Sequence, residues 1–332
     1  MGQVAITHRG RQMQCKDASG TPLQCWMSTL LPDWLSITDV LMPGTHDSGT
    51  FAIESHGCAA VDVASRTQNW DLVSQLMHGV RFLDLRVQSS GSIYHGSVRC
   101  NLQLTDVLAE CAAFLQRHPQ EFLLVRIKHE SPSKRTANKV ASLMSQCMAS
   151  FPFWCGHDLP ALAELRGKIF LLQQWEGKQL GLQWGSPLMH IQDAFWQASG
   201  ARKWQTLKTH LASSLARPGH AQSVIHVHFA SATSVPYQTP RSIARVVNPR
   251  LADYLNAGMR PKGIIVMDFP TVELCSLIVQ CNHQLVQIAA ERHALKIKSR
   301  RPSLTVATST FSHQESLSSA LSSFEMPGSI LM

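Results

Sequence analysis

Several features that would narrow the class of this protein are missing from its 332-residue sequence. No stretch approaches the ~20 apolar residues of a transmembrane helix, and residues 1–25 lack the apolar core of a secretory signal peptide. The nine cysteines include no Cys-x-x-Cys pair, so their spacing gives no zinc motif. We therefore expect an intracellular, cytoplasmic protein with reduced thiols.

Charge is sparse, and its sign is uneven. Charged residues make up only 16% of the chain against 44% hydrophobic residues, and the net charge is +8. Such a composition indicates a globular protein, which is either simply basic or attracted to an anionic surface. No nucleic-acid motif with an aromatic platform stands out. We expect no nucleic-acid partner, a peripheral contact with a lipid membrane, and a monomer.

Apolar runs of strand length alternate with helical patterns along the chain. The candidate strands are residues 37–42, 80–85, 92–94, 122–127, 168–172, 188–191, 224–229 and 263–267. The clearest helical spacings are at residues 102–117, 137–148 and 243–255. This alternation predicts an α/β protein built as a TIM-type (β/α)8 barrel. Because the third and sixth runs are weak, we expect the barrel to be distorted or incompletely closed.

We expect a single domain with a less regular segment at each end. Residues 1–25 form an irregular leader, and residues 26–292 contain the barrel. Residues 293–332 are first basic and then rich in serine and threonine, which predicts a disordered tail.

Ionisable residues stand at the ends of six predicted strands. They are His46, Asp47, Asp84, Arg86, His95, Lys128, Glu130, Asp193 and Asp268. In a parallel barrel these ends meet on one face, where such enzymes place their chemistry. A lone polar residue at a strand end is usually structural, and Asp84 with Arg86 would form an ion pair by default. Ionisable residues at the ends of six strands are hard to explain by packing alone.

Two histidines with an arginine between them can break a phosphodiester without a metal. One imidazole takes a proton, the other gives one, and the guanidinium holds the phosphate. His46, Arg86 and His95 offer this set. His226 and His228 alternate on the seventh predicted strand, and His228 is a weaker candidate.

These residues lie in segments through which the chain resembles the X domain of phosphatidylinositol-specific phospholipase C, particularly its small, metal-independent forms. The segments are Met-Pro-Gly-Thr-His-Asp-Ser at 42–48, Gly-Val-Arg-Phe-Leu-Asp-Leu-Arg at 79–86, Tyr-His-Gly at 94–96, and residues 122–130. Weaker matches continue to Asp268. The resemblance spans residues 26–290.

The resemblance implies roles for five residues. His46 would be the base that deprotonates the inositol 2-hydroxyl, and Asp268 would orient it. Arg86 would stabilise the charge on the phosphate. His95, assisted by Asp47, would protonate the departing diacylglycerol oxygen. The products would be a cyclic inositol phosphate and diacylglycerol, released from phosphatidylinositol-type lipid at a membrane surface.

The resemblance also bears on metals and cofactors. Calcium-dependent members gather acidic residues around the position that Arg86 holds, and a guanidinium there would repel Ca²⁺. We therefore expect no metal and no cofactor. The alternative is an ion gathered by Asp47, Asp84 and Glu130.

The substrate-contacting residues are expected to be Asp84, Lys128, Asp193 and Phe195. The chain has Gln174 in a segment where secreted bacterial members carry an arginine, and Phe195 replaces a stacking tyrosine. These departures leave two alternatives open: a weakly active or inactive module that binds phosphoinositides or proteins, or a phosphodiesterase for another lipid head group. Four tryptophans are candidates for a membrane-facing aromatic rim, namely Trp70, Trp154, Trp175 and Trp184.

Overall fold

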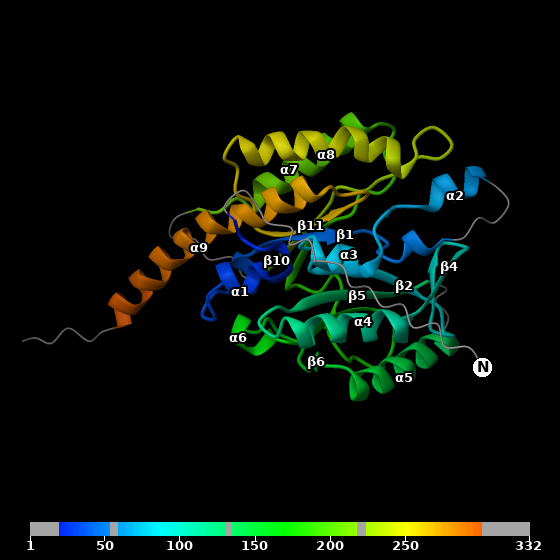
Figure 1. The fold of residues 1–332 in the computed structure, drawn as a ribbon, viewed down its shortest axis with the longest axis horizontal. Helices are drawn as coiled ribbons and strands as arrows, with labels where there is room; N and C mark the ends of the chain where they lie inside the picture. Colours follow the sequence, from blue (N-terminus) through cyan, green and yellow to red (C-terminus); the bar gives the residue numbers. More distant parts are fainter. Residues whose placement is uncertain (1–19, 54–58, 131–133, 218–223, 301–332) are drawn as a thin grey trace, which may run out of the picture.

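The computed structural model describes residues 20–53, 59–130, 134–217 and 224–300 (Figure 1). Its parallel sheet has the strand order β6-β7-β5-β2-β1-β11-β10-β9. These strands are β1 (Leu41–Thr45), β2 (Phe82–Val87), β5 (Leu123–His129), β6 (Phe153–Trp154), β7 (Ile169–Gln174), β9 (Met189–Gln192), β10 (Ile225–Phe229) and β11 (Gly263–Met267). No ladder joins β9 back to β6 within these ranges, so the barrel is open. This confirms the predicted incompletely closed (β/α)8 barrel.

Helices cover the outer face of the sheet. The longer ones are α4 (Leu104–Arg117), α5 (Lys134–Ser150), α7 (Gly200–Ser213), α8 (Pro240–Asn256) and α9 (Val272–Arg300). The shorter ones are α1 (Trp26–Leu30), α2 (Ala59–Ser65), α3 (Leu72–Met77), α6 (Leu162–Leu165) and the 3-10 turns η1 (Leu23–Cys25), η2 (Ile37–Asp39) and η3 (Thr50–Ala52). In Figure 1, α4 and α5 lie on the opposite side of the strands from α7 and α8, and α9 projects beyond the body.

Alternate residues of each strand face the inside of the barrel, as the two-residue period of a strand requires. On β5, Leu124 belongs to the inner core, whereas Val125 and Ile127 pack under the helices. At Gly44 of β1, a Cβ atom would lie 2.8 Å from Phe82 Cδ1, so only glycine leaves room for that ring. The same alternation carries every second side chain at the carboxyl ends into the mouth of the barrel.

Two predicted strands differ from the observed ones, and short strands of the sheet were not predicted. Residues 92–94 belong to β3 (Ser92–His95), which forms an antiparallel hairpin with β4 (Val98–Gln103) instead of a barrel strand. The eighth barrel strand is β6, whose two residues are too few to show a pattern. Residues 37–42 begin as η2, and β1 starts only at Leu41. The predicted strand at 168–172 is β7, beside which a second short strand, β8 (Leu182–Gln183), also pairs.

The two end segments are only partly within the described residues. Residues 20–25 of the leader are packed against the barrel, where the carbonyls of Leu23 and Gln24 accept hydrogen bonds from buried Arg81. Helix α9 runs to Arg300, so residues 293–300 of the expected tail are helical. The rest of the leader and of the tail lies outside the described residues. None of the helices that the structure describes is long and apolar enough to cross a membrane.

Candidate active site

The turn after β1 presents His46 to the mouth of the barrel. The His46 amide donates to the carbonyl of Met267 at the end of neighbouring β11, over 3.0 Å. Gln68 Nε2 then donates to the carbonyls of both His46 and Met267, at 2.8 and 2.9 Å. Asp47 follows with a φ of 42°, a left-handed conformation that aspartate tolerates better than most residues. These hydrogen bonds hold the backbone of the turn and thereby position the side chains of His46 and Asp47.

His46 lies between two carboxylates. Its Nδ1 is 2.9 Å from Asp268 Oδ1, and its Nε2 is 3.1 Å from Asp47 Oδ2. Burial alone would lower the pKa of His46, but the charges of Asp47 and Asp268 outweigh burial and raise this pKa from 6.5 to about 9. With this pKa the ring is mostly protonated near neutral pH, and only its neutral fraction can act as a base.

Asp47 is the centre of the charged cluster. Its Oδ2 is 3.2 Å from His95 Nε2, and its Oδ1 forms a 2.5 Å ion pair with Arg86 Nε, without the alignment of a good hydrogen bond. Burial opposes ionisation of Asp47, but Arg86, His46 and His95 hold its pKa well below the usual range. The pKa of Arg86 is raised in turn, because its nearby carboxylates outweigh its burial. The Asp47 carboxylate thus contacts the side-chain nitrogens of His46, Arg86 and His95.

The hairpin of β3 and β4 positions His95. The Nδ1 of His95 lies 2.6 Å from the carbonyl oxygen of Ser65, which can only accept, so Nδ1 carries a proton. Nε2 can then donate to Asp47 only when the ring is protonated, which is the state of a general acid. Glu130 secures this arrangement by accepting from the Gly96 amide at 2.8 Å and from Arg86 Nη1 at 3.4 Å.

Asp268 is held by an unusual backbone turn. The next residue, Phe269, has a φ of 44°, which is strained for a bulky side chain. The side-chain Nδ2 of Asn248 donates to the carbonyls of Asp268 and Phe269, at 3.0 and 3.2 Å, and so supports the turn. Burial raises the pKa of Asp268, although the contact with His46 opposes this effect.

A cavity of about 400 Å³ opens above these residues. Three of the four predicted substrate-contacting residues line it, namely Lys128, Asp193 and Phe195, together with His46, Arg86, His95 and Asp268. Asp84, the fourth, is fully buried beneath the cavity wall, where it pairs with Arg126 over 3.1 Å. The structure thus brings both histidines, Arg86 and Asp268 to one cavity, with Asp47 directly beneath them.

Arg126 is a cavity residue that the sequence did not reveal. It lies inside the apolar run of β5, where the pattern indicates only a buried strand. Its guanidinium donates twice to Gln174 Oε1, at 2.9 and 2.5 Å, and lies 4.2 Å from the ring centroid of Trp184. The fifth predicted strand, β7, carries no arginine. The neighbouring strand β5 places Arg126 beside Gln174 instead.

The exposed aromatic residues at the mouth are not the tryptophans expected from the sequence. Trp175 is buried, Trp70 and Trp154 pack against the cores, and Trp184 lines the cavity. Exposed apolar side chains beside the cavity are instead Phe195 and Val235, which line it, and Trp196 and Tyr237 on the same two loops; Tyr237 is 84% exposed. A hydrogen bond of 2.8 Å from the Thr233 amide to the Phe195 carbonyl joins the two loops that carry them.

Comparison with known proteins agrees with this geometry. Residues 42–175 match the family model "Phosphatidylinositol-specific phospholipase C, X domain". The chain is 27% identical over 274 residues to the 1-phosphatidylinositol phosphodiesterase of Listeria monocytogenes, covering 77% of this chain and 84% of that protein. Residues 42–175 therefore carry a PI-PLC X domain. The chain is also 28% identical over 157 residues to human PI-PLC X domain-containing protein 1, across 39% of this chain and 47% of that protein.

Solved structures of phosphatidylinositol-specific phospholipases C share the fold of this chain. The structure of the phosphatidylinositol-specific phospholipase C from Listeria monocytogenes superposes with a TM-score of 0.69 at 26% identity, covering 78% of this chain and 98% of that chain. A Staphylococcus aureus enzyme, solved in work on the modulation of its membrane binding, gives a TM-score of 0.67 at 22% identity over 78% of this chain and 97% of that chain.

Proposed function

We propose that this protein cleaves phosphatidylinositol-type lipids by attack of the inositol 2-hydroxyl on phosphorus. The observation that carries the proposal is the convergence of His46, His95 and Arg86 on Asp47 beside a 400 Å³ cavity. The relationship to bacterial 1-phosphatidylinositol phosphodiesterases supports the same reaction class.

In the proposed reaction, each group has one task. His46 Nε2 takes the proton of the 2-hydroxyl while Asp268 keeps the proton of Nδ1 in place. The hydroxyl oxygen forms a bond to phosphorus, and the bond from phosphorus to the diacylglycerol oxygen breaks. His95 Nε2 gives its proton to that departing oxygen. Arg86 stabilises the charge on the non-bridging oxygens, and an internal nucleophile makes the attack favourable.

Arg86 also supports independence from metal ions. Its guanidinium reaches Asp47, Glu130 and, at 3.4 Å, His46 Nε2, so a positive charge already stands where a cation would be drawn by these acids. Of the alternative ion site expected from Asp47, Asp84 and Glu130, the two aspartates lie with His46 in a group whose ligand atoms are close enough for an ion, and Glu130 is not in that group. Activity in the presence of EDTA decides between the two.

We further propose that Lys128, Asp193, Phe195 and Arg126 form the head-group pocket. Asp193 can accept from ring hydroxyls, and the Phe195 ring can stack on a sugar face. Arg126 supplies a guanidinium next to Gln174. This placement favours an inositol head group, because the arginine that its own strand lacks is provided by β5. Asp84 then acts by holding Arg126 and does not contact substrate.

The deciding experiment is incubation with phosphatidylinositol in EDTA, followed by phosphorus NMR. We expect a cyclic inositol phosphate as the first product, and its absence with formation of linear phosphate alone would contradict internal attack. Loss of turnover in EDTA that returns with Ca²⁺ would contradict the role of Arg86. Tight binding to inositol lipid vesicles without any product would support the alternative of a binding module.

The exposed loop residues suggest how the protein meets its substrate. We propose that Trp196 and Tyr237 enter the surface of a membrane as a peripheral contact, because aromatic side chains favour that interface. Replacing both by alanine should weaken binding to anionic vesicles about tenfold or more while cleavage of a soluble substrate stays unchanged. The matched control is Trp34→Ala, a tryptophan that is 41% exposed but is not part of the two loops that carry Trp196 and Tyr237. Equal loss in the control would contradict a specific membrane-facing surface.

A further inference from the structure

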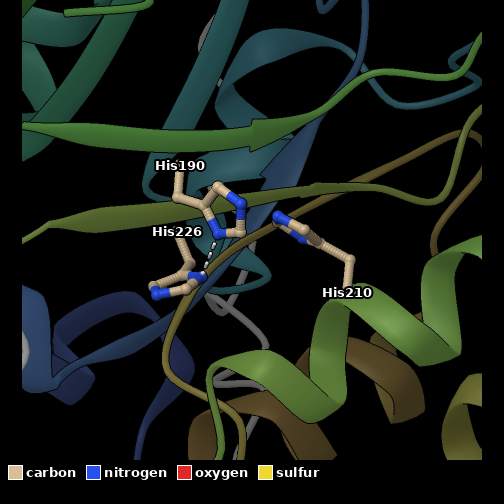
Figure 2. A group of neighbouring side chains, drawn as sticks. All are labelled: His190, His210 and His226. Atoms are coloured by element: carbon tan, nitrogen blue, oxygen red, sulfur yellow. Dashed lines mark hydrogen bonds between the residues drawn. The ribbon is translucent and has the colours of Figure 1, made fainter. Parts of the chain in front are cut away.

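Three histidines from different elements meet on the outer side of the sheet (Figure 2). His190 of β9 stands opposite His226 of β10 in the parallel register, and His210 reaches toward both from the last turn of α7. One ring nitrogen of each lies within 4.8 Å of the other two. Because the three are far apart in the sequence, no spacing motif reveals them.

The spacing of the first pair fits a shared metal ion. His190 Nδ1 and His226 Nδ1 are 3.3 Å apart. Two nitrogens bound at about 2.0–2.1 Å to one tetrahedral Zn²⁺ stand about 3.3–3.4 Å apart. His190 is exposed, so its ring can adjust to the remaining ligand. The two rings are therefore already spaced as a pair of zinc ligands.

A fourth histidine fixes the protonation of the third ligand. His228 Nε2 lies 2.9 Å from the carbonyl oxygen of Lys262, which can only accept, so Nε2 carries the proton and Nδ1 is an acceptor. His210 Nδ1, 2.7 Å from that acceptor, must then donate to it. This leaves the lone pair of the His210 ring on Nε2, which is buried and has no hydrogen-bond partner among the residues that the structure describes. A buried acceptor without a partner is costly and calls for a ligand.

We propose that His190, His210 and His226 bind a divalent ion of the zinc type, with His228 as the group that orients His210. Three neutral imidazoles suit Zn²⁺ and disfavour Ca²⁺ or Mg²⁺, which prefer oxygen ligands. The exposed side of His190 leaves a fourth position for water. A second residue that holds the far nitrogen of a ligating histidine is the usual support of such sites.

This site is separate from the proposed catalytic cavity. His226 and His228 face outward from β10, whereas Val227 and Phe229 belong to the inner core, and the Phe229 ring contacts His46. Two lysines nearby are each held elsewhere: Lys262 pairs with Asp39 at 2.7 Å, and Lys203 donates to the Ala194 carbonyl at 3.0 Å. The expectation of no metal rested on the cysteine spacing and on Arg86, and neither concerns this surface.

The ion would fasten the free edge of the open barrel. It would connect the edge strand β9 to β10 and to α7, and binding to the folded chain alone raises its stability by mass action. A zinc-dependent rise in melting temperature is therefore a readout that does not depend on phosphodiesterase activity.

The test is titration of the metal-free full chain with Zn²⁺ by calorimetry, and with Co²⁺ by visible absorption. We expect one ion per chain and the strong visible bands of four-coordinate Co²⁺. His190→Ala and His210→Ala should each weaken binding at least about tenfold and remove the rise in melting temperature. His228→Gln should weaken binding by about ten- to a hundredfold while keeping all three ligands.

Two controls locate the ion. His157→Ala removes an exposed histidine elsewhere and should leave binding unchanged, as should His46→Gln, which removes the competing group with Asp47 and Asp84. The proposal is overturned if His190→Ala and His210→Ala both bind Zn²⁺ like the wild type, or if His46→Gln alone abolishes binding. Because His190 is exposed, its alanine variant should fold normally, which circular dichroism checks.

Discussion

The pKa of His46 can be measured directly, and it tests how the two carboxylates control the proposed base. A rise from 6.5 to about 9 corresponds, at about 1.4 kcal/mol per pH unit, to about 3 kcal/mol in favour of the protonated ring. Replacing Asp268 by asparagine removes one of the two charges but keeps the size of the side chain. Loss of one adjacent carboxylate should lower the pKa of His46 by about 1–2 units.

The assay is NMR titration of histidine ring signals, with the His46 signal assigned from His46→Gln. In the wild type we expect its midpoint near pH 9, and in Asp268→Asn clearly below that. The ascending limb of kcat/KM should shift to lower pH in the same direction, because the base must be neutral in the free enzyme. Asp193→Asn is the control, since Asp193 lines the same cavity without contributing to the pKa of His46.

The same pKa links stability to pH with a definite sign. Because the folded-state pKa of His46 lies above its unfolded value, its stabilisation is complete below pH 6.5 and is lost as the pH rises toward 9. The unfolding free energy of the wild type relative to His46→Gln should therefore fall by about 3 kcal/mol over this window. Lys203, whose pKa burial lowers to about 8, acts in the opposite direction but is present in both proteins and cancels.

A midpoint near 6.5 for His46 in the wild type would refute this account of the site. A midpoint near 9 that does not move in Asp268→Asn would refute the part assigned to Asp268 and leave Asp47 as the cause. A pH-independent difference in unfolding free energy between the wild type and His46→Gln would contradict the linkage.

Three further changes test the site and the core. Arg86→Lys keeps a positive charge but loses the planar fork, so kcat on micellar phosphatidylinositol should fall by about a hundredfold or more, and near-normal turnover would show that charge alone suffices. Gly44→Ala places a methyl group against Phe82 and should cost about 1–3 kcal/mol in urea unfolding, whereas no loss would mean that the ring moves freely. Arg81→Met leaves buried Glu121 without its 2.8 Å partner and should cost about 3–5 kcal/mol, more than Glu121→Gln in the same denaturation assay.

The apolar runs of strand length in the sequence predicted most of the barrel strands. Seven of the eight parallel strands correspond to apolar runs, because strands buried on both faces read as continuous hydrophobic segments. β6 was missed since two residues carry no period, and the run at 92–94 was assigned to the barrel since a hairpin strand has the same composition. Helix α9 was not predicted, because its apolar residues do not concentrate on one side.

The candidate site could be predicted where a residue stands at a strand end and could not where it stands inside a strand. His46, Arg86 and His95 interrupt or end apolar runs, so they are visible in the sequence. Arg126 lies within such a run, and its role depends on the register that sets Lys128 beside Gln174. The histidine cluster depends on the pairing of β9 with β10, which single-sequence patterns do not contain.

The catalytic cavity and the histidine cluster both lie beside the open edge of the barrel. The cavity is lined from both sides of the break in the sheet: Asp193 and Phe195 follow β9, whereas Gln174 ends β7. A head group attached to a membrane can enter such a site without threading a closed ring of strands. Within the part of the chain that the structure describes, β9 pairs with β10 on one side and with no strand on the other. His190 lies on β9 only three residues before Asp193. An ion held there would restrain the same strand that carries one wall of the cavity, from the outer face and without occupying the catalytic space.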